Sequence, residues 1–173
     1  MQVQNEWGEM RWKGRRLRVT LRRHLEHPVW KVWGMLTDSA CLPLWLAPGQ
    51  MEPRFGGRVQ IAFANSGTPI DSVLTAYDPG RELAYSWSNG DGSLRPLCWT
   101  LTALPEGCTD LRLELNLPEG DRLATSCAGW DAHLEMLVAA LEGIAIHFPR
   151  SRFREARVAF AGMASLLGAC EVA

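Results

Sequence analysis

Apolar and polar residues alternate in short stretches over the first two thirds of the chain. Leu17, Val19 and Leu21 alternate with arginines and a threonine, which indicates a strand over residues 15–25 with one buried and one basic face. Turn-forming residues, for example 89–92, separate the later stretches. This spacing predicts an antiparallel meander. Its further strands are expected at residues 58–63, 71–77, 83–87, 97–101 and 111–115.

Two short helices are predicted between the first strand and the meander. His27-Pro28 opens the first helix, because proline suits the first helical turn. The second helix covers residues 40–46, and Pro43 makes it short or irregular. The apolar face of the first helix is expected to consist of Val29, Trp30, Val32, Trp33 and Leu36.

The longest predicted helix covers residues 121–143. Its apolar residues recur at helical spacing, so they lie on one side and can pack against the concave face of the sheet. Asp131, Glu135 and Glu142 lie on another side and are expected to face water. The apolar positions are Trp130, Leu134, Leu137, Leu141 and Ile144.

A last amphipathic helix is predicted over residues 151–167, after Pro149. Four arginines between residues 150 and 157 lie beside its apolar stripe. Three interpretations are open for residues 150–167: a helix packed on the domain, a homodimer contact, or a docking helix for a protein partner. The stripe consists of Phe153, Ala156, Phe160, Met163 and Leu167.

Length and charge place the chain among ordinary globular proteins. Its 173 residues fit one domain with a substantial core, and its net charge of −1 supplies no electrostatic case for nucleic acid or a membrane surface. The arginines of residues 16–22 are interpreted as solvated strand surface, with a polyanion site as the alternative. No apolar run is long enough for a membrane span, and residues 1–12 lack the apolar core of a signal peptide.

Side chains with catalytic or metal-binding potential are scattered along the chain. The five cysteines are odd in number and lack Cys-x-x-Cys spacing, which argues against a disulfide framework and favours a reducing cytoplasm. The four histidines lack metal-ligand spacing. The nucleophile elbow, the phosphate-binding glycine loop and the dinucleotide fingerprint are all missing. The sequence therefore predicts no catalytic residue, no metal and no cofactor, and a binding protein is favoured over an enzyme.

Several short motifs occur in an order that is typical of one superfamily. The first motifs, in the region of the two short helices, are Val32-Trp33, Leu36-Thr37-Asp38 and Trp45. A predicted strand–turn–strand then ends in Tyr85-Ser86-Trp87, and the apolar stripe of the long helix begins at Gly129-Trp130. Over residues 15–143 the chain resembles the START-like (SRPBCC, helix-grip) superfamily. Within it, the chain is most similar to the branch related to the C-terminal domain of the heat-shock protein 90 ATPase activator.

The resemblance implies an α+β helix-grip fold. We expect a curved antiparallel sheet of about six or seven strands wrapped around a long C-terminal helix, with two short helices after the first strand. Residues 15–143 would form this domain, residues 1–14 an N-terminal extension and residues 144–173 a C-terminal helical extension.

The resemblance also implies a ligand site between the sheet and the long helix. His133 could hydrogen-bond a ligand or move a proton, and Tyr85 could supply a polar group. The alternative is that the apolar members are core and that His133 is a satisfied histidine. The candidate ligand-binding residues are Trp45, Phe63, Tyr85, Trp87, Trp99, Leu113, Trp130, His133, Leu134 and Leu137.

Three functions fit this fold, because fold alone does not determine function. The first is non-catalytic binding of a small apolar or aromatic molecule in the cavity. The second is a protein-interaction module that stimulates a chaperone ATPase, as the resembled branch implies. The third is an enzyme of the cyclase or aldolase kind that uses the same cavity.

Overall fold

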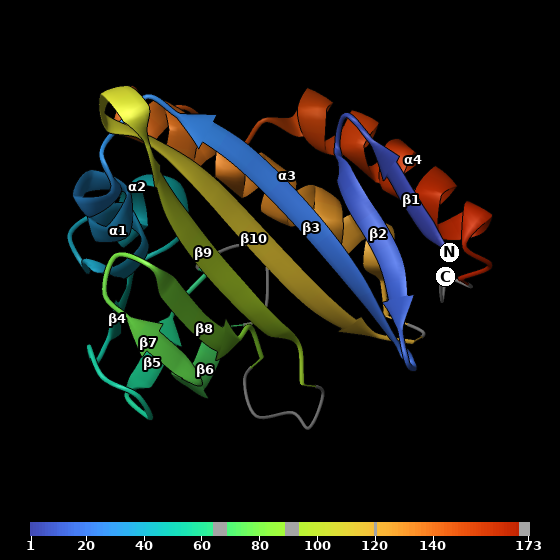
Figure 1. Ribbon diagram of the computed structural model, residues 1–173, viewed down its shortest axis with the longest axis horizontal. Helices are drawn as coiled ribbons and strands as arrows, with labels where there is room; N and C mark the ends of the chain where they lie inside the picture. The colour runs from blue at the N-terminus through green and yellow to red at the C-terminus, as the bar shows by residue number, and fades with distance from the viewer. Residues whose placement is uncertain (64–68, 89–93, 120, 170–173) are drawn as a thin grey trace.

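A long antiparallel sheet lies on one side of the molecule and two long helices lie on the other (Figure 1). The computed structural model describes residues 1–63, 69–88, 94–119 and 121–169. The sheet has seven strands in the order β1-β2-β3-β10-β9-β8-β7. Its strands are β1 Gln2–Asn5, β2 Gly8–Lys13, β3 Arg16–Leu25, β7 Ala76–Asp78, β8 Glu82–Ser86, β9 Pro96–Leu104 and β10 Cys108–Pro118.

A second sheet of three strands, in the order β4-β5-β6, lies beside β7 and β8. Its strands are β4 Gly49–Met51, β5 Arg58–Ile61 and β6 Ile70–Val73. The single strand expected over residues 71–77 is therefore wrong: it is divided between the two sheets. The backbone changes partner within one residue, because the Leu74 N–H donates to Gly57 O and the Thr75 N–H donates to Ala84 O. The turn expected at residues 89–92 lies outside the described residues.

The helices follow the predicted order. They are α1 Val29–Thr37, α2 Leu42–Trp45, α3 Leu123–Leu141 and α4 Arg150–Leu166, with a 3-10 turn at Pro105–Gly107. One detail of α1 differs from the prediction: Trp30 is 74% exposed, whereas Val32, Met35 and Leu36 are buried. Those three residues share one helical face, and Trp30 projects away from it.

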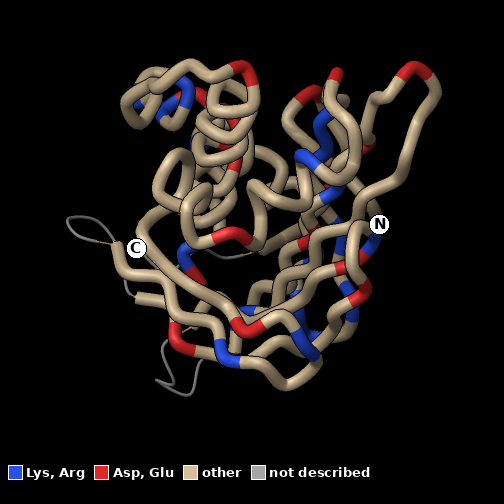
Figure 2. The backbone as a smooth tube through the Cα atoms, turned by 90° about the vertical axis from the view of Figure 1, so that its left-hand side faces the viewer, with Lys and Arg blue, Asp and Glu red and all other residues tan. Residues whose placement is uncertain are grey.

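The core fills the space between the concave face of the sheet and α3. On the inner face, Leu21 pairs with Leu113 and Val19 pairs with Leu115, and all four side chains are fully buried. Leu134 and Leu137 of α3 are buried against this layer. Figure 2 shows the sheet curving around the helices. This is the helix-grip arrangement that the sequence predicts, and the fold class is confirmed.

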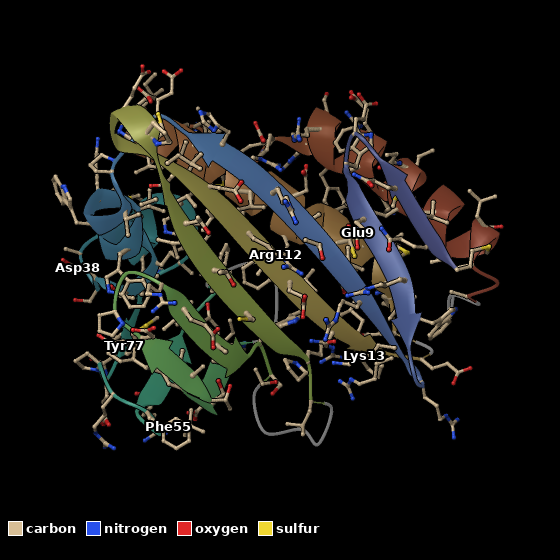
Figure 3. All side chains as sticks on the ribbon, in the orientation of Figure 1. Glu9, Lys13, Asp38, Phe55, Tyr77 and Arg112 are labelled. Atoms are coloured by element: carbon tan, nitrogen blue, oxygen red, sulfur yellow. The ribbon has the colours of Figure 1, made fainter. Side chains whose placement is uncertain are left out.

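The outer face of the sheet carries charged side chains, in keeping with a solvated surface. Figure 3 shows Glu9 and Arg112 on the face of the sheet that lies opposite the helices. Arg18 Nε lies 3.2 Å from Glu114 Oε1, and Arg112 Nη2 lies 2.8 Å from Glu114 Oε2. Arg18 and Arg112 of this face are thus both paired with one acidic residue of the same sheet, Glu114.

The first two strands and the α4 helix pack on this framework. Residues 2–13 form β1 and β2, and β2 pairs with β3 in the main sheet. The α4 helix lies along α3 and buries Ala156, Phe160 and Met163, so its apolar stripe is covered within the chain. The Trp12 indole N–H donates to Leu167 O at 3.1 Å. Of the three interpretations of residues 150–167, the helix packed on the domain is confirmed, and the homodimer contact and the docking helix stay predictions.

One residue on the polar side of α3 does not face water as its sequence predicts. Asp131 is fully buried, although Glu135 and Glu142 are partly exposed. Arg23 of β3 and Arg152 of α4 both reach the Asp131 carboxylate. The prediction for Asp131 is wrong because α4, which packs over this side of α3, supplies the partner that permits burial of the charge.

No helix among the described residues has the length and apolar character needed to cross a bilayer.

Candidate functional site

A cavity of about 390 Å³ lies between the N-terminal half of α3 and the strands that face it. It is partly open to solvent. One wall is a single face of α3, since its members recur at intervals of three or four residues. These are Thr125, Ser126, Gly129, Trp130 and His133, together with Arg122 immediately before the helix. The remaining wall is formed by Leu46, Phe63, Ile70, Trp87, Ser88, Arg95 and Asp121.

Gly129 keeps the middle of the helical wall open. A Cβ atom built on it meets nothing within 4 Å, so the space in front of this backbone is empty. Ser126 precedes it on the same face and Trp130 follows it. A larger side chain at position 129 would therefore project into the cavity.

Tryptophan rings form the stiff part of the wall. Trp87 and Trp130 meet edge to face at 5.9 Å with an interplanar angle of 86°. Trp130 also packs on Trp99 at 5.9 Å, and Trp99 packs on Trp45 at 5.9 Å. Edge-to-face pairs are a favourable geometry for aromatic rings. The chain of four rings therefore links the cavity wall to the core and holds Trp87 and Trp130 in place.

His133 closes the end of the cavity nearest α2. Its Nδ1 lies 3.0 Å from the carbonyl oxygen of Trp45, and its ring packs against Phe63 at 6.0 Å and Phe148 at 5.6 Å. Burial lowers the pKa of His133, and the hydrogen bond with Trp45 opposes this effect. The imidazole is thus favoured in its neutral form near pH 7.

The opposite end of the cavity is polar. Arg95 Nε lies 2.8 Å from Asp121 Oδ2, and its guanidinium carbon lies 5.4 Å from the centre of the Trp87 ring. Asp121 is only 9% exposed at its side chain. Arg122, the residue before α3, lies beside this pair and is exposed. An apolar wall with a polar group at each end is typical of small-molecule sites.

Four of the ten candidate residues lie on the cavity wall: Phe63, Trp87, Trp130 and His133. The other six are buried and do not line the cavity. They do not line it because their side chains lie deeper in the core, between the sheet and the helices, where close packing leaves little space. They are Trp45, Tyr85, Trp99, Leu113, Leu134 and Leu137.

Tyr85 illustrates the difference between core and wall. Its hydroxyl is fully buried and accepts a hydrogen bond from the Trp99 side chain, and burial raises the Tyr85 pKa to about 12. Its polar group is therefore engaged inside the core and does not line the cavity.

The polar lining residues of the cavity are not among those predicted from the sequence. Ser126 and Arg122 could have been found by extending the helical face of Trp130 back towards the N-terminus of α3. Arg95 and Asp121 had no such signal, because 26 residues separate them and only the fold brings them together. Among the described residues, no group of three or more His, Cys, Asp or Glu side chains could hold a metal ion.

Comparisons with solved structures agree with this architecture. EF2215 from Enterococcus faecalis has a TM-score of 0.78 at 16% identity, covering 92% of this chain and 91% of EF2215. CalU16 from Micromonospora echinospora has a TM-score of 0.73 at 21% identity, covering 89% of this chain and 93% of CalU16. These two likenesses concern the fold alone.

DynU16, a protein of the dynemicin biosynthetic locus, has a TM-score of 0.65 at 25% identity, covering 74% of this chain and 48% of DynU16. No functionally curated protein matches the chain in sequence. The profile of one protein family matches residues 26–142, which is well over half of the chain. The family resemblance expected from the motifs is confirmed, and the chain belongs to the family described as Activator of Hsp90 ATPase homolog 1-like protein.

Proposed function

We propose that this protein binds a small, largely apolar aromatic molecule in the cavity between α3 and the sheet. The observation that carries the proposal is the empty space in front of Gly129, bounded by the Trp87 and Trp130 rings. The volume of about 390 Å³ lies within the range of about 300–1,000 Å³ that is usual for ligand pockets.

The rigidity of the wall supports the same proposal. Trp130 is 5% exposed and is held between Trp87 and Trp99, so it cannot readily collapse into the cavity. A preformed apolar cavity lets a flat ring bind without the cost of ordering the wall. The occurrence of DynU16 in a biosynthetic locus is compatible with a small organic ligand.

A plugging substitution tests the proposal. Gly129→Phe places a ring in the cavity, and Gly162→Phe is the matched control because Gly162 is also inside a helix with nothing within 4 Å of its Cβ position. Glycine-to-phenylalanine changes the helix propensity of both variants in the same direction. The two variants therefore differ mainly in whether the added ring enters the cavity.

The measurement is a titration of ¹⁵N-labelled protein with 2-methoxynaphthalene, followed by NMR. We expect the indole N–H signals of Trp87 and Trp130 to shift, and that of the exposed Trp30 to stay in place. Gly129→Phe should abolish the shifts, whereas Gly162→Phe should leave them unchanged. Equal binding by both variants, or shifts confined to Trp30, would show that the cavity is not the site.

A further inference from the structure

The hydrogen bond between His133 and Trp45 determines which imidazole nitrogen carries the proton. The partner of Nδ1 is a backbone carbonyl oxygen, 3.0 Å away, and a carbonyl oxygen can only accept. Nδ1 must therefore be the donor. In the neutral ring, Nε2 is then unprotonated and offers a lone pair.

The surroundings of Nε2 leave this lone pair unused. Within residues 1–63, 69–88, 94–119 and 121–169, no hydrogen bond reaches Nε2. The rings packed around the imidazole belong to Phe63, Trp130 and Phe148. Phe63 and Phe148 have no polar atom to offer, and the indole N–H of Trp130 makes no hydrogen bond with Nε2. Since His133 lines the cavity, a donor for Nε2 has to come from an occupant or from water.

The charges at the other end of the cavity restrict that donor. Arg95 is paired with Asp121, and Arg122 is exposed beside them with no ion pair among the described residues. Counted over the lining residues that the structure describes, Arg95, Asp121 and Arg122, the cavity thus has one positive charge in excess. A cationic ligand is disfavoured by this excess, whereas a neutral or weakly acidic donor is not. Arg122 and His133 lie about 16 Å apart along the helix axis, at the helical rise of 1.5 Å per residue, so one elongated ring system could extend between them.

Building on the proposed ligand function, we propose that the ligand is a hydroxylated aromatic compound, of phenol or enol type, whose O–H donates a hydrogen bond to His133 Nε2. The neutral state of the ring is supported by burial, which lowers the His133 pKa. This hydrogen bond discriminates against a ligand that lacks the donor, because such a ligand would displace water from Nε2 without replacing the hydrogen bond that water makes there.

A matched pair of probes tests this assignment. The first is 2-naphthol, which carries the donor, and the second is 2-methoxynaphthalene, which has the same ring system without it. We expect 2-naphthol to bind the wild-type protein about tenfold more tightly, the ratio that one net hydrogen bond confers. Protonated naphthylmethylamine should bind more weakly than either.

Two variants separate the role of Nε2 from the contact with Trp45. His133→Asn keeps an N–H near the Nδ1 position, and so the bond to the Trp45 carbonyl, but it removes the acceptor at Nε2. His133→Gln puts an amide oxygen near the Nε2 position. In His133→Asn we expect 2-naphthol and 2-methoxynaphthalene to bind equally tightly, because the hydrogen bond to Nε2 is lost. In His133→Gln the preference for 2-naphthol should return in part.

The outcomes distinguish this inference from the proposed function. If both probes bind the wild-type protein equally well and Gly129→Phe blocks both, the cavity binds aromatic rings and the hydroxyl assignment is wrong. If His133→Asn weakens both probes by the same factor, His133 acts only by holding the wall, and the assignment is again wrong. If neither probe binds the wild-type protein, both proposals are overturned.

Discussion

Arg152 and Asp131 form a bidentate ion pair that joins α4 to α3 where the carboxylate has no contact with solvent. Arg152 Nε lies 2.7 Å from Asp131 Oδ2, and Arg152 Nη2 lies 3.1 Å from Oδ1. Arg23 of β3 donates to the same carboxylate at 2.6 Å. The Arg152 guanidinium also lies 4.8 Å from the centre of the Trp7 ring. The α4 helix, the α3 helix, strand β3 and the β1–β2 hairpin therefore meet at one buried charge.

Replacing this carboxylate should weaken the whole assembly. Asp131→Asn leaves two guanidinium groups without their buried counter-charge, and breaking such a pair costs about 3–5 kcal/mol. We expect the free energy of unfolding, measured with urea, to fall by roughly 3 kcal/mol. Glu119→Gln removes the exposed partner of Arg15 and serves as the control, with an expected change below about 1 kcal/mol. If Asp131→Asn and Glu119→Gln lower the free energy of unfolding equally, the buried ion pair does not stabilise the fold more than an exposed one.

The guanidinium of Arg152 should be hard to replace by another cation. Arg152→Lys keeps the charge but loses the bidentate geometry and the stacking on Trp7. We expect a loss of about 1–2 kcal/mol in urea unfolding, together with a change in Trp7 fluorescence. Arg154→Lys, at an exposed position of the same helix, should change the stability by less than about 0.5 kcal/mol. If Arg152→Lys leaves the free energy of unfolding unchanged, only the positive charge at position 152 contributes to stability, and the bidentate geometry does not.

The stability of the fold should depend on the protonation of His133. Burial lowers its pKa in the folded protein below the unfolded value of about 6.5, so the unfolded state binds the proton more readily in this range. The free energy of unfolding should therefore decline as the pH drops below about 7 and level off once the pH is below the folded pKa. Urea titrations between about pH 7.5 and pH 5 measure this slope.

The control for this pH dependence is the same series on two variants. His133→Gln should remove the part of the pH dependence of the unfolding free energy that His133 contributes. His147→Gln, at an exposed position, should keep that part. A slope that is identical in the wild-type protein and in His133→Gln would contradict the assignment to His133.

Two helical glycines should be replaceable by alanine with a gain in stability. A Cβ meets nothing within 4 Å at Gly129 or at Gly162, and glycine in a helix interior is less favourable than alanine by about 1 kcal/mol. Each single variant should therefore raise the unfolding free energy by about 0.5–1 kcal/mol. Since the sites lie on different helices, the double variant should show the sum. A loss of stability at Gly129 would mean that the cavity is narrower than its geometry implies.

Much of the architecture follows from local patterns in the sequence. Alternating apolar residues such as Leu17, Val19 and Leu21 determine which strand face is buried, because successive side chains of a strand point to opposite sides. The helical stripe of α3 determines that it packs against the sheet. The motifs around Trp33, Trp87 and Trp130 were sufficient to identify the family, which the profile match confirms.

The division of residues between core and cavity was decided only by the tertiary structure. Trp99 and Trp130 have equally apolar side chains, yet only Trp130 reaches the cavity, because that depends on how neighbouring side chains fill the available volume. The same limit applies to charges. Periodicity placed Asp131 on a water-facing side of α3, and it became buried because Arg152, 21 residues further on, packs over it. The local sequence pattern therefore determined which elements form and which of their faces are apolar. The positions of the cavity and of the buried charge depend on pairs of residues that are distant in the sequence. Such pairs contribute to the free energy only once the chain has folded, so the tertiary structure alone determined these positions.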